Sequence, residues 1–128
     1  MSRSLFLTIA ALMAIGVGGM ALLAPETMLS SKGIVGNAVA RVWMREVGAV
    51  LFAVGVVAWR VRHHEDSPTL RAFLWGNAVL QLALLPIELM ARSQGVIPST
   101  AGVVPNSVLH VVLAAGFIVH ARAVRPRA

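Results

Sequence analysis

The sequence predicts an all-α fold class: a four-helix transmembrane bundle, up-down-up-down, with both termini cytoplasmic. Only 12% of the residues are charged and 58% are hydrophobic, whereas a soluble domain carries roughly 25% charged residues. The hydrophobic residues gather in four segments, and a helix needs about 20 residues to cross the hydrocarbon core. Residues 1–128 are therefore expected to form a single integral membrane domain with helices at about 5–24, 39–59, 70–91 and 106–121.

The composition excludes several classes of site. The chain has no cysteine, which rules out disulfides, thiolate metal sites and cysteine nucleophiles. It also has no zinc motif and no Gly-rich phosphate loop, so we expect no metal and no cofactor. The net charge of +6 fits basic residues that face lipid headgroups better than it fits nucleic acid. The lipid bilayer is thus the expected partner of the surface.

The first segment, 5–24, carries no charge and is followed by Pro25, which ends a helix. The residues before Pro25 lack the small-x-small pattern of a signal-peptide cleavage site. We therefore expect this helix to be retained in the protein. Residues 25–38, with serines and glycines that favour turns, are expected to form a loop.

The second segment is harder to place in a membrane. Its uncharged part, 47–59, has only thirteen residues, and thirteen residues of helix are too short to cross a bilayer. To span, the helix must include the charged residues that precede this part, which are Arg41, Arg45 and Glu46. Glycines in the first two segments suit close helix packing; they are Gly16, Gly18, Gly19, Gly48 and Gly55.

The third and fourth segments follow a charged hairpin at residues 60–68. Polar side chains interrupt the third segment at Asn77, Gln81 and Glu88, and Arg92 lies just past its end. At about 100° per residue these four side chains fall within roughly 60° of one another, and such a stripe should face the bundle rather than lipid.

Basic residues set the expected orientation. Seven arginines lie at the N-terminus, in the second loop and at the C-terminus: Arg3, Arg60, Arg62, Arg71, Arg122, Arg125 and Arg127. The opposite side has four basic residues: Lys32, Arg41, Arg45 and Arg92. The positive-inside rule then places both termini in the cytoplasm and the protein in the inner membrane as a multi-pass protein.

With that topology the polar residues converge at the outer end of the bundle. The second helix begins there, the third ends there and the fourth begins there with Asn106 and His110. Arg45 stands near a helix N-terminus and Glu88 near a C-terminus, so each opposes the dipole of its own helix. We therefore expect Glu88 to pair with Arg45 or Arg41 across the bundle. This pair could belong to a pocket or could simply dock two helices, and Arg41 could instead reach the headgroups.

The stretch from Arg45-Glu46-Val47-Gly48 to Trp59, followed by charged residues and then Ser67-Pro68-Thr69-Leu70-Arg71-Ala72, resembles small four-helix bacterial proteins of the DoxX-like kind. The resemblance covers about half of the chain and implies a four-helix membrane bundle. That grouping includes companion subunits of redox enzymes, so it assigns no single activity. Small multidrug exporters have a similar length, but they keep an essential glutamate in the first helix, where this chain has no charge.

An apolar chamber with a few convergent polar groups is the usual form of a ligand site. The leading hypothesis is therefore a binder of a lipophilic small molecule, or an enzyme that isomerises it, opens its epoxide or cyclises it. Glu88 or Glu46 would be the general acid and His110 the base. The expected substrate-binding residues are Arg45, Arg41, Asn106, Asn77 and Gln81. Two other hypotheses stay open: an accessory subunit of a membrane complex or homo-oligomer, and a small transporter.

Overall fold

The computed structural model describes residues 1–125, so Arg127, one of the seven arginines in the charge count, lies outside that range. The described part of the chain is 81% helical and has no strand, which confirms the all-α fold class. Four helices are long and apolar enough to cross a membrane. They are α1 (Arg3–Leu23), α3 (Ala38–Val61), α4 (Pro68–Ser93) and α5 (Val104–Ala123).

All four long helices begin one or two residues before the expected positions. Three of them have a polar capping residue there: Ser2, Asn37 and Ser67. Each capping side chain accepts a hydrogen bond from the backbone amide three residues later. Because these amides have no partner within the helix, the caps stabilise the helix starts.

The expectation of a loop throughout 25–38 is wrong in its first half. Residues Pro25–Ser31 form a short helix, α2. Pro25 does end α1, but it also occupies the first turn of α2, where the missing amide hydrogen costs nothing and the fixed φ favours a helix. A second short element, the 3-10 turn η1 (Thr100–Gly102), precedes α5.

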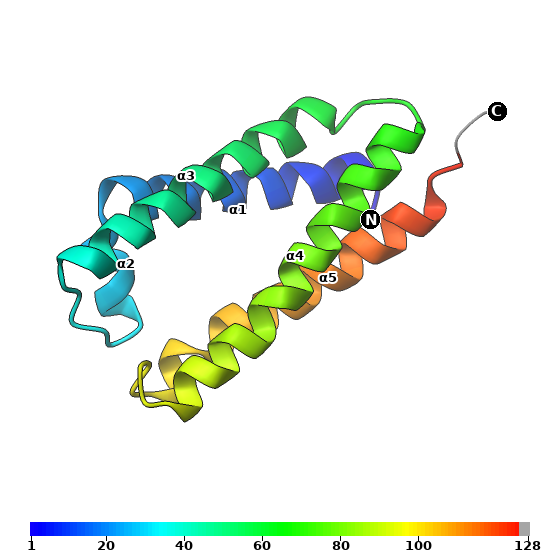
Figure 1. The fold of residues 1–128 in the computed structure, drawn as a ribbon. Coiled ribbons are helices and arrows are strands. Elements are labelled where there is room, and N and C mark those ends of the chain that lie inside the picture. Colours follow the sequence, from blue (N-terminus) through cyan, green and yellow to red (C-terminus); the bar gives the residue numbers. More distant parts are fainter. Residues whose placement is uncertain (126–128) are drawn as a thin grey trace.

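The long helices are arranged as two pairs (Figure 1). α1 lies along α3, and α4 lies along α5. The pairs meet where the N-terminus lies beside the α3–α4 connection, and they diverge toward α2 and the α4–α5 connection. We call the meeting point the Phe6 end and the opposite end, with α2 and residues 94–103, the Glu88 end.

Aromatic and aliphatic packing joins the two pairs at the Phe6 end. The rings of Phe6 on α1 and Phe117 on α5 meet edge to face, with centroids 4.9 Å apart. Leu7 and Leu74 are fully buried beside them. Asp66, in the α3–α4 connection, accepts hydrogen bonds from the Arg3 side chain and from the backbone amide of Arg125. The residues near both ends of the described range therefore lie beside this connection.

Glycine brings α1 and α3 into backbone contact. A Cβ atom added to Gly18 would lie 2.5 Å from the backbone nitrogen of Phe52, and one added to Gly48 would lie 2.5 Å from that of Leu22. Gly55 packs against Ile15 in the same way. The packing interpretation is confirmed at these three glycines, whereas Gly16 and Gly19 have no tight neighbour.

A loop contact joins the two pairs again at the Glu88 end. Lys32, directly after α2, lies against η1, since a Cβ atom on Gly102 would be 2.8 Å from the Lys32 carbonyl oxygen. Gly33 has a φ of 74° and approaches Pro98. This turn brings the Lys32 side chain to the space between the pairs.

Candidate functional site

A cavity of about 280 Å³ lies between the two helix pairs. Its walls are mainly aliphatic, with side chains from α1, α3, α4 and α5 such as Met13, Leu51 and Leu84. Two lining residues, Val47 on α3 and Ile87 on α4, are about half exposed, at 49% and 54%. At these two residues the cavity wall is therefore continuous with the exposed apolar surface of α3 and α4.

Glu88 lies in the cavity wall near the end of α4 and is only 8% exposed. Its carboxylate contacts three side chains. Lys32 Nζ lies 2.6 Å from Oε1, the Asn106 amide donates to the same oxygen, and Ser107 Oγ donates to Oε2 at 3.1 Å. A carboxylate and an ammonium group that are removed from water are stable only when they pair and form further hydrogen bonds. Glu88 has both kinds of contact.

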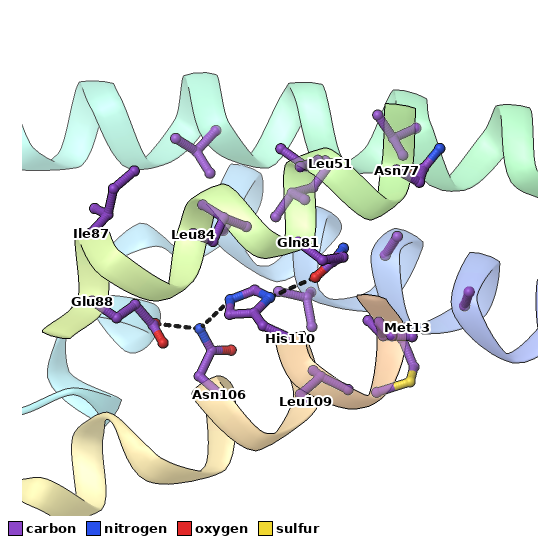
Figure 2. Close-up of a pocket in the computed structure, with 18 of the residues that line it drawn as sticks. Met13, Leu51, Asn77, Gln81, Leu84, Ile87, Glu88, Asn106, Leu109 and His110 are labelled. Atoms are coloured by element: carbon purple, nitrogen blue, oxygen red, sulfur yellow. Dashed lines mark hydrogen bonds between the residues drawn. The ribbon is translucent and has the colours of Figure 1, made fainter. Parts of the chain in front are cut away.

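A chain of hydrogen bonds continues from Glu88 into the cavity (Figure 2). The Asn106 amide nitrogen lies 3.0 Å from His110 Nε2, and His110 Nδ1 lies 2.6 Å from Gln81 Oε1. His110 and Asn106 are one turn apart on α5, while Gln81 and Glu88 lie on α4. The polar side chains thus link the two helices of this pair.

The direction of these hydrogen bonds follows from the charges. An ionised Glu88 only accepts, so the Asn106 group facing it must be the NH₂, which also donates to His110 Nε2. His110 is then neutral with its proton on Nδ1, and it donates to the Gln81 carbonyl oxygen. The Gln81 NH₂ group is left directed to the cavity.

Asn77 lies one turn before Gln81 on the same wall. Its NH₂ group donates to the Phe73 carbonyl oxygen at 2.9 Å, which leaves its own carbonyl oxygen for the cavity. Asn77 and Gln81 are 7% and 8% exposed. Within residues 1–125 neither the Asn77 oxygen nor the Gln81 nitrogen has a hydrogen-bond partner.

The expected ion pair between Glu88 and Arg45 or Arg41 is wrong. Glu88 pairs with Lys32, while Arg41 Nη1 lies 3.0 Å from Oε1 of Glu26 on α2. The reason is the divergence of α3 from α4, which carries the start of α3 away from Glu88, whereas the turn after α2 approaches it (Figure 1). Arg41 and Arg45 line a separate surface pocket with residues 23–27.

Five of the eight candidate side chains line the cavity: Asn77, Gln81, Glu88, Asn106 and His110. The three from the start of α3 do not, and two of these, Arg45 and Glu46, are exposed. A helix start alone does not fix which neighbour its side chains face. The polar stripe on α4 did indicate the inward face for Asn77, Gln81 and Glu88, but its fourth member, Arg92 in the last turn, is exposed and lies outside the cavity wall.

The sequence reasoning missed Lys32 and Ser107 as partners of Glu88. Lys32 is the one lysine of the chain and the one charged residue between Thr27 and Ala40. That isolation was the available signal. A lone cation in a turn that joins two membrane helices is a candidate partner for a buried carboxylate. Ser107 had no signal beyond its position next to Asn106.

Among residues 1–125 no group of three or more His, Cys, Asp or Glu side chains is placed to hold a metal ion. Comparison of the chain with protein-family models, curated proteins and solved structures finds no match. The DoxX-like resemblance in the sequence therefore stays a prediction.

Proposed function

We propose that the protein is a membrane-embedded receptor or carrier for a lipophilic small molecule, which it binds between its two helix pairs. The observation that supports this most is the cavity itself. Its walls are aliphatic, its polar groups gather on α4 and α5, and exposed Val47 and Ile87 mark an opening between α3 and α4. A lipophilic molecule could enter this opening directly from the bilayer.

Binding fits these contacts better than acid–base catalysis does. A general acid must hold a proton, but Lys32, Asn106 and Ser107 all stabilise Glu88 as a carboxylate. A general base needs a free lone pair, but both His110 nitrogens are already hydrogen bonded. Isomerase, epoxide-opening or cyclase chemistry would require this network to rearrange around the substrate.

Transport and accessory roles have less support. A permeation path would have to pass the Phe6 end, where Phe6, Phe117 and Leu74 are packed and buried. An accessory subunit or homo-oligomer would need no cavity in the bundle. The exposed apolar faces of the helices suit contact with the lipid bilayer itself.

Photocrosslinking in lipid nanodiscs tests the proposal. An alkyl diazirine, offered at low mole fraction, should crosslink to cavity residues such as Leu84 and Leu113. The variant Ala14→Trp places an indole in the cavity and should reduce that labelling severalfold. Ala53→Trp, on the exposed face of α3, is the matched control and should not. Labelling confined to lipid-facing residues in the unchanged protein would refute the proposal.

The proposed location is the inner membrane, with an up-down-up-down path and both termini cytoplasmic. The grouping of arginines at the N-terminus, the α3–α4 connection and the C-terminus supports this orientation. Because the chain has no cysteine, single cysteines can report it without background. A membrane-impermeant thiol reagent added outside the cell should block Gln94→Cys. Glu65→Cys should be blocked only by a reagent that crosses the membrane. The reverse pattern would invert the orientation.

A further inference from the structure

We propose that the ligand of the cavity carries an uncharged hydroxyl group, which binds between the Asn77 carbonyl oxygen and the Gln81 amide nitrogen. This inference rests on the proposed function and specifies its ligand. Figure 2 shows the two side chains one turn apart on α4, with Gln81 also joined to His110.

The first argument is that the two side chains have unused hydrogen-bonding atoms. Asn77 and Gln81 are more than nine-tenths buried and line the cavity. Within the described residues, the Asn77 oxygen and the Gln81 nitrogen have no partner. Neither atom is sealed from solvent, since Arg3 Nε is the buried side-chain atom without a partner among residues 1–125, so water in the cavity can reach both. A ligand group that pairs with both atoms would displace that water and take over its hydrogen bonds within a mainly aliphatic cavity.

The second argument concerns which atoms are presented. The Phe73 carbonyl oxygen holds the Asn77 NH₂ group, so an acceptor is left free. The Lys32–Glu88 pair acts through Asn106 and His110 to hold the Gln81 oxygen, so a donor is left free. One wall thus presents one acceptor and one donor, with Cβ atoms about 5–6 Å apart, as for any residues one helical turn apart.

A hydroxyl group matches this arrangement because it donates one hydrogen bond and accepts another. It can donate to Asn77 and accept from Gln81 with a single oxygen atom. An ether or a ketone can only accept, so it leaves the Asn77 oxygen unpaired. A carboxylate would bring its charge against that oxygen, and Lys32, the cation that the described residues place in the cavity wall, is already paired with Glu88.

Probes that differ only at one end test the inference in nanodiscs. Four alkyl diazirines of equal length would end in a hydroxyl, a methoxy, a methyl or a carboxylate group. Crosslinks to cavity residues should be about tenfold more frequent for the hydroxyl than for the methyl probe, the gain expected from one or two net hydrogen bonds in place of contacts with water. The methoxy probe should fall between them, and the carboxylate should label least.

Variants assign the preference to the two amides. Asn77→Leu removes the free acceptor without disturbing His110, so it should lower the hydroxyl-to-methyl ratio severalfold and leave methyl labelling intact. Gln81→Leu should do the same where it folds. Gln94→Leu, an exposed glutamine after α4, is the matched control and should keep the ratio.

The outcomes separate this inference from the proposed function. Equal labelling of the cavity by hydroxyl and methyl probes would overturn the hydroxyl preference, while lipophilic binding would stand. A hydroxyl preference that survives Asn77→Leu would overturn the assigned binding point. Absence of cavity labelling by all four probes would overturn both proposals together.

Discussion

The α1–α3 and α4–α5 interfaces hold pairs of membrane helices together with different kinds of residue. Between α1 and α3, Gly18 and Gly48 let the two backbones touch. Between α4 and α5, side chains bridge the helices through Gln81–His110 and Glu88–Asn106 hydrogen bonds. In lipid, apolar side chains gain little from helix contact, so close packing and hydrogen bonds are the two available sources of attraction.

The two helix pairs contribute different kinds of residue to the cavity. The α1–α3 pair contributes aliphatic wall residues such as Met13, Val17 and Leu51. The α4–α5 pair contributes the amides and the histidine, and Lys32 supplies the countercharge. The glycine interface therefore joins the two helices of the apolar wall, while the polar interface supplies the hydrogen-bonding groups of the cavity. We therefore expect large steric effects on stability from substitutions between α1 and α3. Substitutions between α4 and α5 should have smaller effects that depend on side-chain chemistry.

The largest expected effect is at the glycine interface. Gly48→Ala should lower the free energy of unfolding by about 3 kcal/mol, at the upper end of overpacking effects. The new Cβ would lie within 3 Å of the Leu22 nitrogen, the Gly18 oxygen and the Ala21 carbonyl carbon. These are all backbone atoms, so no side-chain rotation can relieve the clash. Unfolding in mixed detergent–SDS micelles gives the measurement.

Gly16→Ala is the matched control, because a Cβ there has no neighbour within 4 Å. It should leave stability unchanged or raise it slightly, since alanine favours a helix over glycine. Equal stability of the Gly48→Ala and Gly16→Ala proteins would mean that α1 and α3 do not touch at Gly48.

The next largest effect is expected at the Lys32–Glu88 pair. Lys32→Met leaves the Glu88 carboxylate without its cation and should cost about 2–3 kcal/mol, less than a fully buried pair because both side chains keep some exposure. Lys32→Met with Glu88→Gln should cost at least about 1 kcal/mol less than the two single losses together. The same unfolding assay on both single variants and the double variant gives this coupling.

A second double-variant cycle tests the correction of the expected pair. Arg45→Met with Glu88→Gln should be additive within about 0.5 kcal/mol, because the two side chains have separate surroundings. Coupling of Glu88 to Arg45 but not to Lys32 would restore the pair expected from sequence.

The sequence alone predicted the positions of the helices better than it predicted which side chains contact each other between them. Hydrophobic segments and capping residues such as Ser67 define where a membrane helix begins, and both are local properties. The α4 stripe correctly placed Asn77, Gln81 and Glu88 on one inward wall. The partner of Glu88 depended on how far α3 diverges from α4 and on the turn after α2, which are properties of the whole fold. Helix-dipole arguments explained why Glu88 needs a cation but could not identify which one.

A smaller effect is expected within the polar chain. Asn106→Ala removes hydrogen bonds to Glu88 and His110 and should cost about 1–2 kcal/mol. It also frees His110, so Gln81 loses its fixed orientation, and the hydroxyl-to-methyl labelling ratio should fall. Ser107→Ala removes only a bond to the other Glu88 oxygen, and it should cost less and leave the ratio unchanged. Equal ratios in the two variants would mean that Asn106 does not orient Gln81.

The smallest effect is expected at the Phe6 end, where a second ion pair joins the start of α1 to the α3–α4 connection. Arg3 pairs with Asp66, but their side chains are 25% and 34% exposed, against 20% and 10% for Lys32 and Glu88. Water therefore competes more strongly for the Arg3–Asp66 pair, and the buried Arg3 Nε has no hydrogen-bond partner within residues 1–125, which offsets part of the gain. Arg3→Met should cost about 0.5–1 kcal/mol, as exposed pairs do.

Salt sharpens the contrast between the two ion pairs. At about 1 M salt the Debye length falls to about 3 Å, which screens exposed charges far more than buried ones. The stability loss from Arg3→Met should then nearly vanish, while most of the loss from Lys32→Met should persist. Unfolding of both variants at low and high salt measures the two losses side by side. If both decline in parallel, water reaches the Lys32–Glu88 pair as freely as it reaches Arg3, and the chain from Lys32 to Gln81 could not hold a fixed direction.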